Sequence, residues 1–371
     1  MTVESEEEET EMPRHGMIVR STLVFAAAAA VAALAVAIAG AARDKRQGIT
    51  LDGAGSSLIA PAVQGVWAPA YQSAKGVTVN YASVGSGTGI ANITARTVDF
   101  GASDAPMTPA QLKACNGCVQ VPWALTATAV VVNIPGIHQG ELQLSGPVIA
   151  KIFLGQITNW SDPAIKALNP GVKLPSEKIT VAHRSDGSGD SYVFTNYLSK
   201  INPQWHHTVG YGTSVSWPAG VGGKGNSGVA AIIASTNGSI GYVSAAYTIP
   251  NHLIMAKVKN ASGHFVLPEI KTIEAAAQLV KAQRIPADNH IDITDPPRAV
   301  GKATRKYSLA YPLATFTYVI VPIRAPKGSA IKAFVNWAMS AREQKAIQRL
   351  VFAPLPPVVT GAASRTLAKI R

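Results

Sequence analysis

The sequence predicts an α/β protein, because short β-branched or aromatic runs alternate with helical stretches from residue 49 onward. The predicted strands are bounded by Gly, Pro or Asn, and they are VTVNYA (77–82), TATAVVVNI (126–134), KITVAH (178–183), SIGYV (239–243) and TFTYVIVP (315–322). The predicted helices are SYVFTNYLSKI (191–201), VAAIIAST (229–236) and AIKAFVNWAMSA (330–341). This alternation favours a largely parallel sheet.

Periodicity supports the first strand and the last helix. Val77, Val79 and Tyr81 share one face of a strand, because alternate residues of a strand point the same way. Ile331 and Phe334 begin an apolar stripe at helical spacing. Both segments therefore have one face that can be buried.

Composition indicates a protein with a buried core and room for two domains. The 371 residues are 47% hydrophobic and 15% charged. Of the 33 Lys and Arg and 21 Asp and Glu, residues 1–48 hold 5 and 7, so the remainder carries a formal charge of +14. Nucleic acid is not the expected partner, since no Lys/Arg block is interleaved with aromatic residues. An anionic small ligand, an anionic membrane surface or an acidic habitat fits this charge better.

Residues 1–48 differ from the rest of the chain and are left out of the fold prediction. A Glu-rich start leads to residues 21–42, an uncharged apolar run of 22 residues that is long enough to cross a bilayer as a helix. Arg14 and Arg20 precede the run, as in an export signal. We therefore predict a cytoplasmic tail followed by a signal peptide or a membrane anchor, and both alternatives stay open.

The two cysteines, Cys115 and Cys118, lie in the sequence CNGC. A zinc site of this kind would need a second Cys pair, and a thioredoxin-like redox motif would need a strand leading directly into a helix; the sequence has neither. In an oxidising exterior we expect a small structural disulfide, with a reduced pair as the alternative.

Three turns rich in Gly and Ser precede predicted helices: GAGSSLIAP (53–61), SVGSGTGI (83–90) and RSDGSGDS (184–191). A helix N-terminus has N–H groups without intrahelical partners and about half a positive charge, so it binds an oxyanion directly. Glycine lets the backbone approach a ligand, and serine adds a hydroxyl donor. In an α/β sheet these turns gather at the carboxyl ends of the strands. Together, and with Arg184 in the third turn, they predict an oxyanion site.

Carboxylates accompany these turns. Asp104 lies in DFGASDAP (99–106), and Asp186 and Asp190 lie within the third turn. A carboxylate repels an anion unless the anion carries a proton to donate, as phosphate does at neutral pH and sulfate does not. Carboxylates in the site would therefore select phosphate over sulfate.

Several motifs occur together in order: GAGSSLIAP, YASVGSGTGI, VDFGASDAP, HRSDGSGDSYVFTNYLS, GVGGKGNSGVAA and IGYV. This set resembles the substrate-binding proteins of ABC-type inorganic phosphate transporters, and the similarity runs from about residue 49 to FVNWA (334–338). The resemblance implies an α/β, two-lobed periplasmic-binding-protein-like fold of class II with two crossover strands, behind the N-terminal signal or anchor helix. Lobe I would contain residues 49–132 and 314–371, and lobe II residues 133–313.

The resemblance also implies the ligand contacts. Asp104 would accept the phosphate proton, and Arg184, held by Asp186 or Asp104, would supply the buried cation. Hydroxyl and backbone N–H donors would come from Ser57, Leu58, Ser86, Ser188 and Gly189. Two positions depart from the family: Leu58 replaces a frequent aromatic residue but leaves its N–H available, and Asp190 stands where threonine is common. Asp190 is either a second carboxylate acceptor or a solvent-facing helix cap.

The residues indicate recognition rather than catalysis. The turns lack the spacing of a G-x-S-x-G nucleophile elbow, and VGGKGNSG (221–228) does not fit the P-loop pattern. We expect a monomeric extracytoplasmic protein, without cofactor or metal, that binds inorganic phosphate between the lobes and delivers it to ABC transporter permease subunits. It would bind the membrane only through an uncleaved N-terminal helix. The alternatives are a receptor for arsenate or sulfate, and a secreted phosphate-scavenging or phosphatase-like protein.

Overall fold

The computed structural model describes residues 48–278, 280, 285–297 and 307–371. Ile49–Arg371 form one compact unit. The predicted tail and the predicted signal or anchor run at 21–42 lie outside the described residues. Among the helices inside these ranges, none is both long and apolar enough to cross a membrane.

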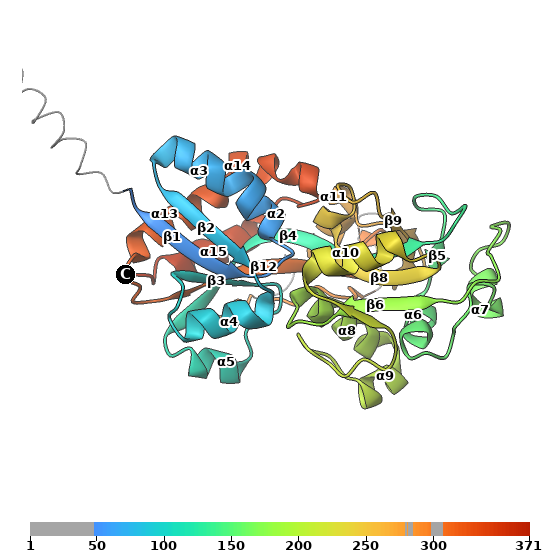
Figure 1. The fold of residues 1–371 in the computed structure, drawn as a ribbon. Helices are drawn as coiled ribbons and strands as arrows, with labels where there is room; N and C mark the ends of the chain where they lie inside the picture. Colours follow the sequence, from blue (N-terminus) through green and yellow to red (C-terminus); the bar gives the residue numbers. More distant parts are fainter. Residues whose placement is uncertain (1–47, 279, 281–284, 298–306) are drawn as a thin grey trace, which may run out of the picture. The chain divides into compact units, whose positions relative to one another are not determined.

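A mixed sheet organises the described part of the chain, with strand order β2-β1-β3-β12-β4-β8-β6-β7 and with β9 paired to β4 (Figure 1). Its strands are β1 (Thr50–Gly55), β2 (Thr78–Ser83), β3 (Phe100–Ser103), β4 (Cys118–Asn133), β6 (Thr180–Arg184), β7 (Val221–Gly223), β8 (Ser239–Ser244), β9 (Ile254–Met255) and β12 (Ala314–Pro322). A smaller sheet, in the order β11-β10-β5, contains β5 (Gln143–Leu144), β10 (Lys257–Lys259) and β11 (Phe265–Val266). All the predicted strands are confirmed, although the predicted 126–134 strand is only the second part of β4.

The long strand β4 belongs to both halves of the large sheet. Its residues 118–127 pair with β12, and from Thr128 to Asn133 it pairs with β8. The outer pairs β1–β2, β1–β3, β6–β7 and β6–β8 are parallel. The expectation of a largely parallel sheet is wrong at the centre, where β4 and β12 are antiparallel to each other and to their outer neighbours. They run in opposite directions because the chain leaves the first half along β4 and returns along β12.

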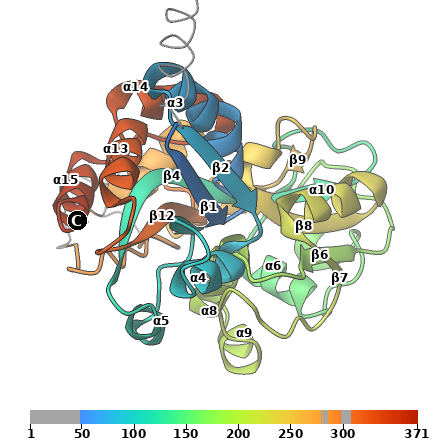
Figure 2. The same cartoon turned by 60° about the vertical axis from the view of Figure 1, so that its left-hand side comes forward.

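Helices cover both halves of the sheet (Figure 2). α4 (Ser86–Thr94) packs on β1 and β3, α10 (Gly225–Ser235) packs on β8 and β6, and α8 (Gly189–Ile201) packs on β8 and β4. The other helices of the described ranges are α2 (Ala60–Ala62), α3 (Ala68–Lys75), α5 (Pro109–Ala114), α6 (Gly146–Phe153), α7 (Pro163–Lys166), α9 (Pro203–Thr208), α11 (Ile270–Ala277), α13 (Gly328–Ala338), α14 (Ala341–Ala346) and α15 (Pro357–Leu367), with the short helical turns η1 (Val63–Trp67), η2 (Ala245–Tyr247) and η5 (Gln348–Leu350). The three predicted helices are confirmed as α8, α10 and α13, the last of which ends at Ala338.

Two large apolar clusters support the sheet. In the first, Trp67 and Trp123 are fully buried, with ring centroids 5.3 Å apart. In the second, Phe194 stacks on Tyr242 with centroids 4.5 Å apart, and Phe153 packs against both rings. Burial of a phenylalanine such as Phe153 or Phe194 stabilises the fold by roughly 1.5–3 kcal/mol. These cores hold the turns at the strand ends in fixed positions.

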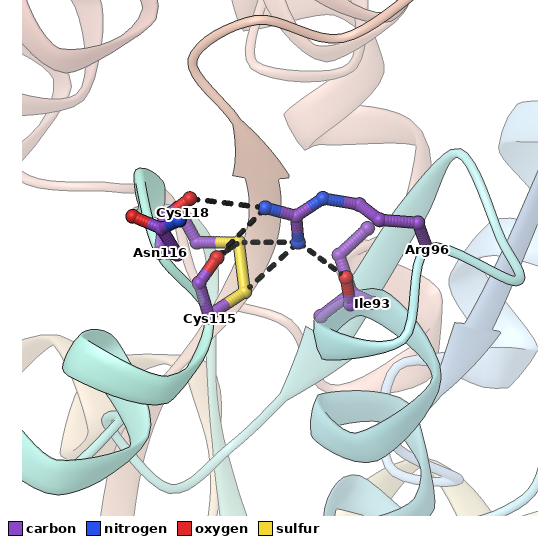
Figure 3. The surroundings of a disulfide bond; sticks show 5 residues. All are labelled: Ile93, Arg96, Cys115, Asn116 and Cys118. Atoms are coloured by element: carbon purple, nitrogen blue, oxygen red, sulfur yellow. Dashed lines mark hydrogen bonds between the residues drawn. A yellow bond between two sulfur atoms is a disulfide. The ribbon is translucent and has the colours of Figure 1, made fainter.

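The cysteine pair joins the end of α5 to the start of β4. Cys115 and Cys118 are joined by a disulfide. Beside it, Arg96 Nη1 donates to the Ile93 carbonyl at 2.6 Å and lies 3.3 Å from both sulfur atoms (Figure 3). Arg96 Nη2 donates to the carbonyls of Cys115 and Asn116, at 2.7 and 3.1 Å. The guanidinium therefore links the end of α4 to the turn that precedes β4.

Candidate oxyanion-binding site

Four turns, each from a strand to a helix, converge in the structure. They join β1 to α2, β2 to α4, β6 to α8 and β7 to α10. Contacts between them cross large distances in the sequence. Asn226 Nδ2 donates to Ser57 Oγ at 2.9 Å, and the Gly189 N–H donates to Ser86 Oγ at 3.1 Å. The carboxyl ends of strands in both halves of the sheet thus contribute to one polar network, where α/β proteins commonly bind ligands.

Glycine permits the closest approaches in this network. The Gly87 N–H donates to the Gly187 carbonyl at 2.9 Å. A Cβ atom at Gly187 would lie 3.1 Å from the Cα atom of Gly87, which is tighter than ordinary packing. A Cβ atom at Gly189 would lie 2.4 Å from Asp104 Oδ2, so only glycine fits beside this carboxylate.

Asp104 lies inside the network and is 1% exposed. Its Oδ2 accepts hydrogen bonds from the Ser56 hydroxyl at 2.5 Å and from the Ser86 hydroxyl at 3.4 Å. Its Oδ1 is also buried, yet it accepts no hydrogen bond of ordinary geometry from the residues that the structure describes. The Thr317 hydroxyl, likewise buried and without a partner, lies near enough to help lower the pKa of Asp104. A buried polar atom without a partner costs about 1–3 kcal/mol. Oδ1 is therefore suited to accept a hydrogen bond from a ligand.

The environment of Asp104 also changes its protonation. Its pKa is raised to about 7, first because burial disfavours the charged carboxylate and second because Asp190 is negative. The hydrogen bond from Ser56 and the positive charge of Arg184 act in the opposite direction. The proton occupancy of Asp104 therefore changes near neutral pH.

Arg184, at the end of β6, is 3% exposed and supplies the positive charge of the network. Its Nε donates to Asp186 Oδ1 at 2.7 Å and its Nη2 donates to Asp186 Oδ2 at 2.5 Å, a two-pronged pairing. Its Nη1 lies 3.3 Å from Asp190 Oδ2. We expected Asp186 or Asp104 to hold this arginine; Asp186 does so, together with Asp190. Burial opposes ionisation of Asp186, but Arg184 and the Gly225 N–H lower its pKa.

Asp190 points into the network from the first turn of α8. It is 1% exposed, so the alternative of a solvent-facing helix cap is wrong. The Thr128 hydroxyl donates to its Oδ1 at 2.8 Å, and Asn226 Nδ2 donates to its Oδ2 at 2.7 Å. Burial raises the pKa of Asp190, against the lowering effects of Arg184, Asn226 and Thr128. Its role as a second ligand acceptor stays a prediction.

Two of the predicted donors bond within their own turns. The Ser188 hydroxyl caps α8 by accepting a hydrogen bond from the Ser191 N–H at 3.2 Å. The Leu58 N–H donates to Ser56 Oγ at 3.0 Å, and the Leu58 side chain is fully buried in the first apolar cluster. In this conformation the Ser56 hydroxyl turns back onto the start of the helix and accepts the Leu58 N–H, so the role of that N–H as a ligand donor stays a prediction.

The sequence reasoning missed three residues of the network, Ser56, Thr128 and Asn226. Ser56 stands next to Ser57 in the first turn, and only the fold determines which serine faces Asp104. Thr128 lies inside β4 and carries no local signal. Asn226 lies in the VGGKGNSG loop, where the resemblance to the phosphate-binding family was a signal for it.

The fold and the network define a class of protein. Serine hydroxyls, backbone N–H groups and one guanidinium surround buried carboxylates at the ends of strands from two half-sheets. Within the described ranges, no group of three His, Cys, Asp or Glu residues is arranged to hold a metal ion. The fold is of the periplasmic-binding-protein type, and the network contains the kinds of donor and acceptor that an oxyanion site requires.

Comparison with known proteins makes the assignment more specific. A family model described as a PBP superfamily domain matches residues 36–342. The phosphate-binding protein PstS of Xylella fastidiosa (strain Temecula1) is 40% identical over 317 residues, which cover 85% of this chain and 84% of that protein. PstS of Pasteurella multocida is 41% identical over 320 residues, which cover 84% and 88%. The chain belongs to the PBP superfamily and, within it, to the family of the phosphate-binding proteins PstS.

A solved structure agrees with this fold. The phosphate-binding protein of Stenotrophomonas maltophilia superposes with a TM-score of 0.65 at 20% identity, covering 86% of this chain and 93% of that one.

Proposed function

We propose that the protein binds inorganic phosphate in the network around Asp104 and Arg184 and delivers it to the permease of an ABC transporter. The observation that carries the proposal is the buried Oδ1 of Asp104, which lacks a donor among the described residues. Phosphate keeps at least one proton near neutral pH and can donate it there, whereas sulfate cannot. The names of the PstS relatives support the same ligand.

The other phosphate oxygens need donors. We propose that they come from Ser57, Leu58, Ser86, Arg184, Ser188 and Gly189, with Asp186 orienting the arginine. Asp190 would act as a further acceptor. The N–H groups of Leu58 and Gly189 would have to exchange their present acceptors, Ser56 Oγ and Ser86 Oγ, for the ligand. The Ser188 hydroxyl accepts from the Ser191 N–H and keeps its own proton to donate.

The proposed binding site lies between two lobes, one of residues 49–132 and 314–371 and the other of residues 133–313. The change of partner along β4, from β12 to β8 at Thr128, supports a hinge at that level. Hinge closure would bury the anion and present one shape to the permease.

Binding should depend little on salt, because the ion pairs of the site are buried and are screened weakly. The site contains one arginine and three aspartates, so the formal charge of +14 beyond residue 48 comes from other parts of the chain. That charge would help to capture phosphate at a distance or suit an acidic environment.

We propose an extracytoplasmic location, with residues 21–42 acting as a signal peptide or a membrane anchor. The Cys115–Cys118 disulfide supports an oxidising compartment. We further propose that the protein is a monomer, is not an enzyme and requires no cofactor.

Titration calorimetry of the protein with phosphate, arsenate and sulfate tests the proposal. We expect tight binding of phosphate, weaker or equal binding of arsenate and no binding of sulfate. Tight sulfate binding would contradict the role of Asp104. Hydrolysis of a generic phosphomonoester that is lost in Ser188→Ala would indicate a phosphatase, whereas a binding protein would gain thermal stability with free phosphate.

A further inference from the structure

The phosphate contacts proposed above give no role to Asn226. It lies in the first turn of α10, is fully buried, and contacts groups from three other elements. Its Nδ2 donates to Ser57 Oγ at 2.9 Å and to Asp190 Oδ2 at 2.7 Å. Its Oδ1 accepts the Ser244 N–H at 2.7 Å.

The Ser244 contact determines which way the amide points. A backbone N–H can only donate, so it must face the amide oxygen. The NH₂ group then faces Ser57 and Asp190, and both of its hydrogens are used. Asn226 is thus an obligatory donor toward the site.

This donor sets the polarity of the Ser57 hydroxyl. Ser57 Oγ accepts from Asn226 Nδ2 at 2.9 Å and from the Asn226 N–H at 3.3 Å. A hydroxyl oxygen has two lone pairs and one proton. With both lone pairs engaged, Ser57 can act toward another group only as a hydrogen-bond donor. An anion requires a donor.

The same amide keeps Asp190 in the acceptor form. A hydrogen bond to a carboxylate stabilises its charged state. Loss of the Asn226 donor would leave Asp190 with the Thr128 hydroxyl at 2.8 Å and the longer Arg184 contact at 3.3 Å. Protonation of Asp190 would follow more readily, since burial already raises its pKa.

We propose that Asn226 is a positioning residue of the oxyanion site: its amide holds Ser57 as a donor and Asp190 as an acceptor. The inference rests on the proposed function, because it assigns these polarities to phosphate. Ser57 follows β1 and Asn226 follows β7, so their hydrogen bond also joins the two halves of the sheet.

The test is the isosteric change Asn226→Asp, with phosphate affinity measured by calorimetry between pH 5.5 and 8. At pH 8 we expect affinity to fall about 100-fold relative to wild type, because the new carboxylate accepts the Ser57 proton and repels Asp190. At pH 5.5 the ratio to wild type should shrink to about tenfold or less, as the new group gains a proton and donates again. The ionisable groups around this position are Asp190, Asp186, Arg184, Asp104, Tyr247 and Lys224, so every value is compared with wild type at the same pH.

A double-mutant cycle with Ser57→Ala and Asn226→Ala covers the case in which the aspartate variant does not fold. If Asn226 acts through Ser57, its removal should weaken phosphate binding at least about fivefold less in the Ser57→Ala background than in wild type. Asn169→Ala is the matched control, since Asn169 is a buried amide bonded to Gln143 and Ile165. It should lower the melting temperature and leave affinity unchanged.

The outcomes separate the two proposals. A wild-type protein that binds no phosphate would overturn both. Phosphate binding by wild type, combined with a pH-independent ratio for Asn226→Asp, would overturn the positioning role alone. Additive effects in the cycle would overturn the part of that role that acts through Ser57.

Discussion

Two arginines near the two ends of α4 make opposite kinds of contact. Arg184, beside the N-terminal end, is buried and bonded to the carboxylates of Asp186 and Asp190. Arg96, just beyond the C-terminal end, is an exposed residue whose guanidinium bonds to neutral backbone carbonyls beside the disulfide. The partner therefore decides the energetic role. Removing Arg184 leaves carboxylates in a dry site without their cation, whereas removing the exposed Arg96 leaves neutral carbonyls that water can then reach.

The largest effect should follow Arg184→Ala. Asp186 and Asp190 would remain as carboxylates without their cation, and breaking a buried pair in this way costs about 3–5 kcal/mol of unfolding free energy. Phosphate affinity should fall about 1,000-fold or more. Calorimetry would measure the affinity, and thermal unfolding the loss of stability.

Arg184→Lys tests whether charge alone is enough. A lysine cannot reproduce the two-pronged contact with Asp186, so most of the affinity should remain lost. Recovery of affinity to within about fivefold of wild type would show that the geometry of the arginine is dispensable.

Asp104 should make the stability of the protein depend on pH, an effect of intermediate size. Its folded-state pKa of about 7 lies above the ordinary value of 3.8, so the folded protein binds this proton more tightly than the unfolded chain does. The stabilisation from this group is therefore present at low pH and is lost as the pH rises from about 4 to about 7.

The Asp104→Asn substitution should reduce this loss of stability with rising pH. The melting temperature of the ligand-free variant should fall less between pH 4.5 and pH 7.5 than that of wild type. Asp190 has a raised pKa with the same sign and is present in both proteins, so the difference between the two curves reports Asp104. Parallel curves would contradict the raised pKa.

Local patterns predicted most of the fold, but they could not predict contacts between distant segments. The runs at 77–82 and 315–322 form strands because their β-branched and aromatic residues suit a buried sheet. The antiparallel centre escaped prediction, since the pairing of β4 with β12 joins residues about 190 positions apart in the chain.

The candidate site shows the same limit. The Gly- and Ser-rich turns predicted the helix N-termini, because those residue types are required locally. The contact between Thr128 and Asp190 and the choice of Ser56 as the partner of Asp104 depend on how β4, α8 and the first turn meet. No local rule contains that information.

The smallest effect should come from the Arg96 side of the comparison. Replacing Cys115 and Cys118 together by serine opens a short covalent loop, which corresponds to about 2 kcal/mol in the chain-entropy treatment. Arg96→Ala should cost less, about 1 kcal/mol, because its carbonyl partners can bond to water instead.

Phosphate affinity should stay within about threefold in both variants, since Arg96 bonds neither to Asp104 nor to Ser86. A tenfold loss of affinity would instead mean that α4 transmits a change at the disulfide to Ser86. Both arginines would then affect phosphate binding.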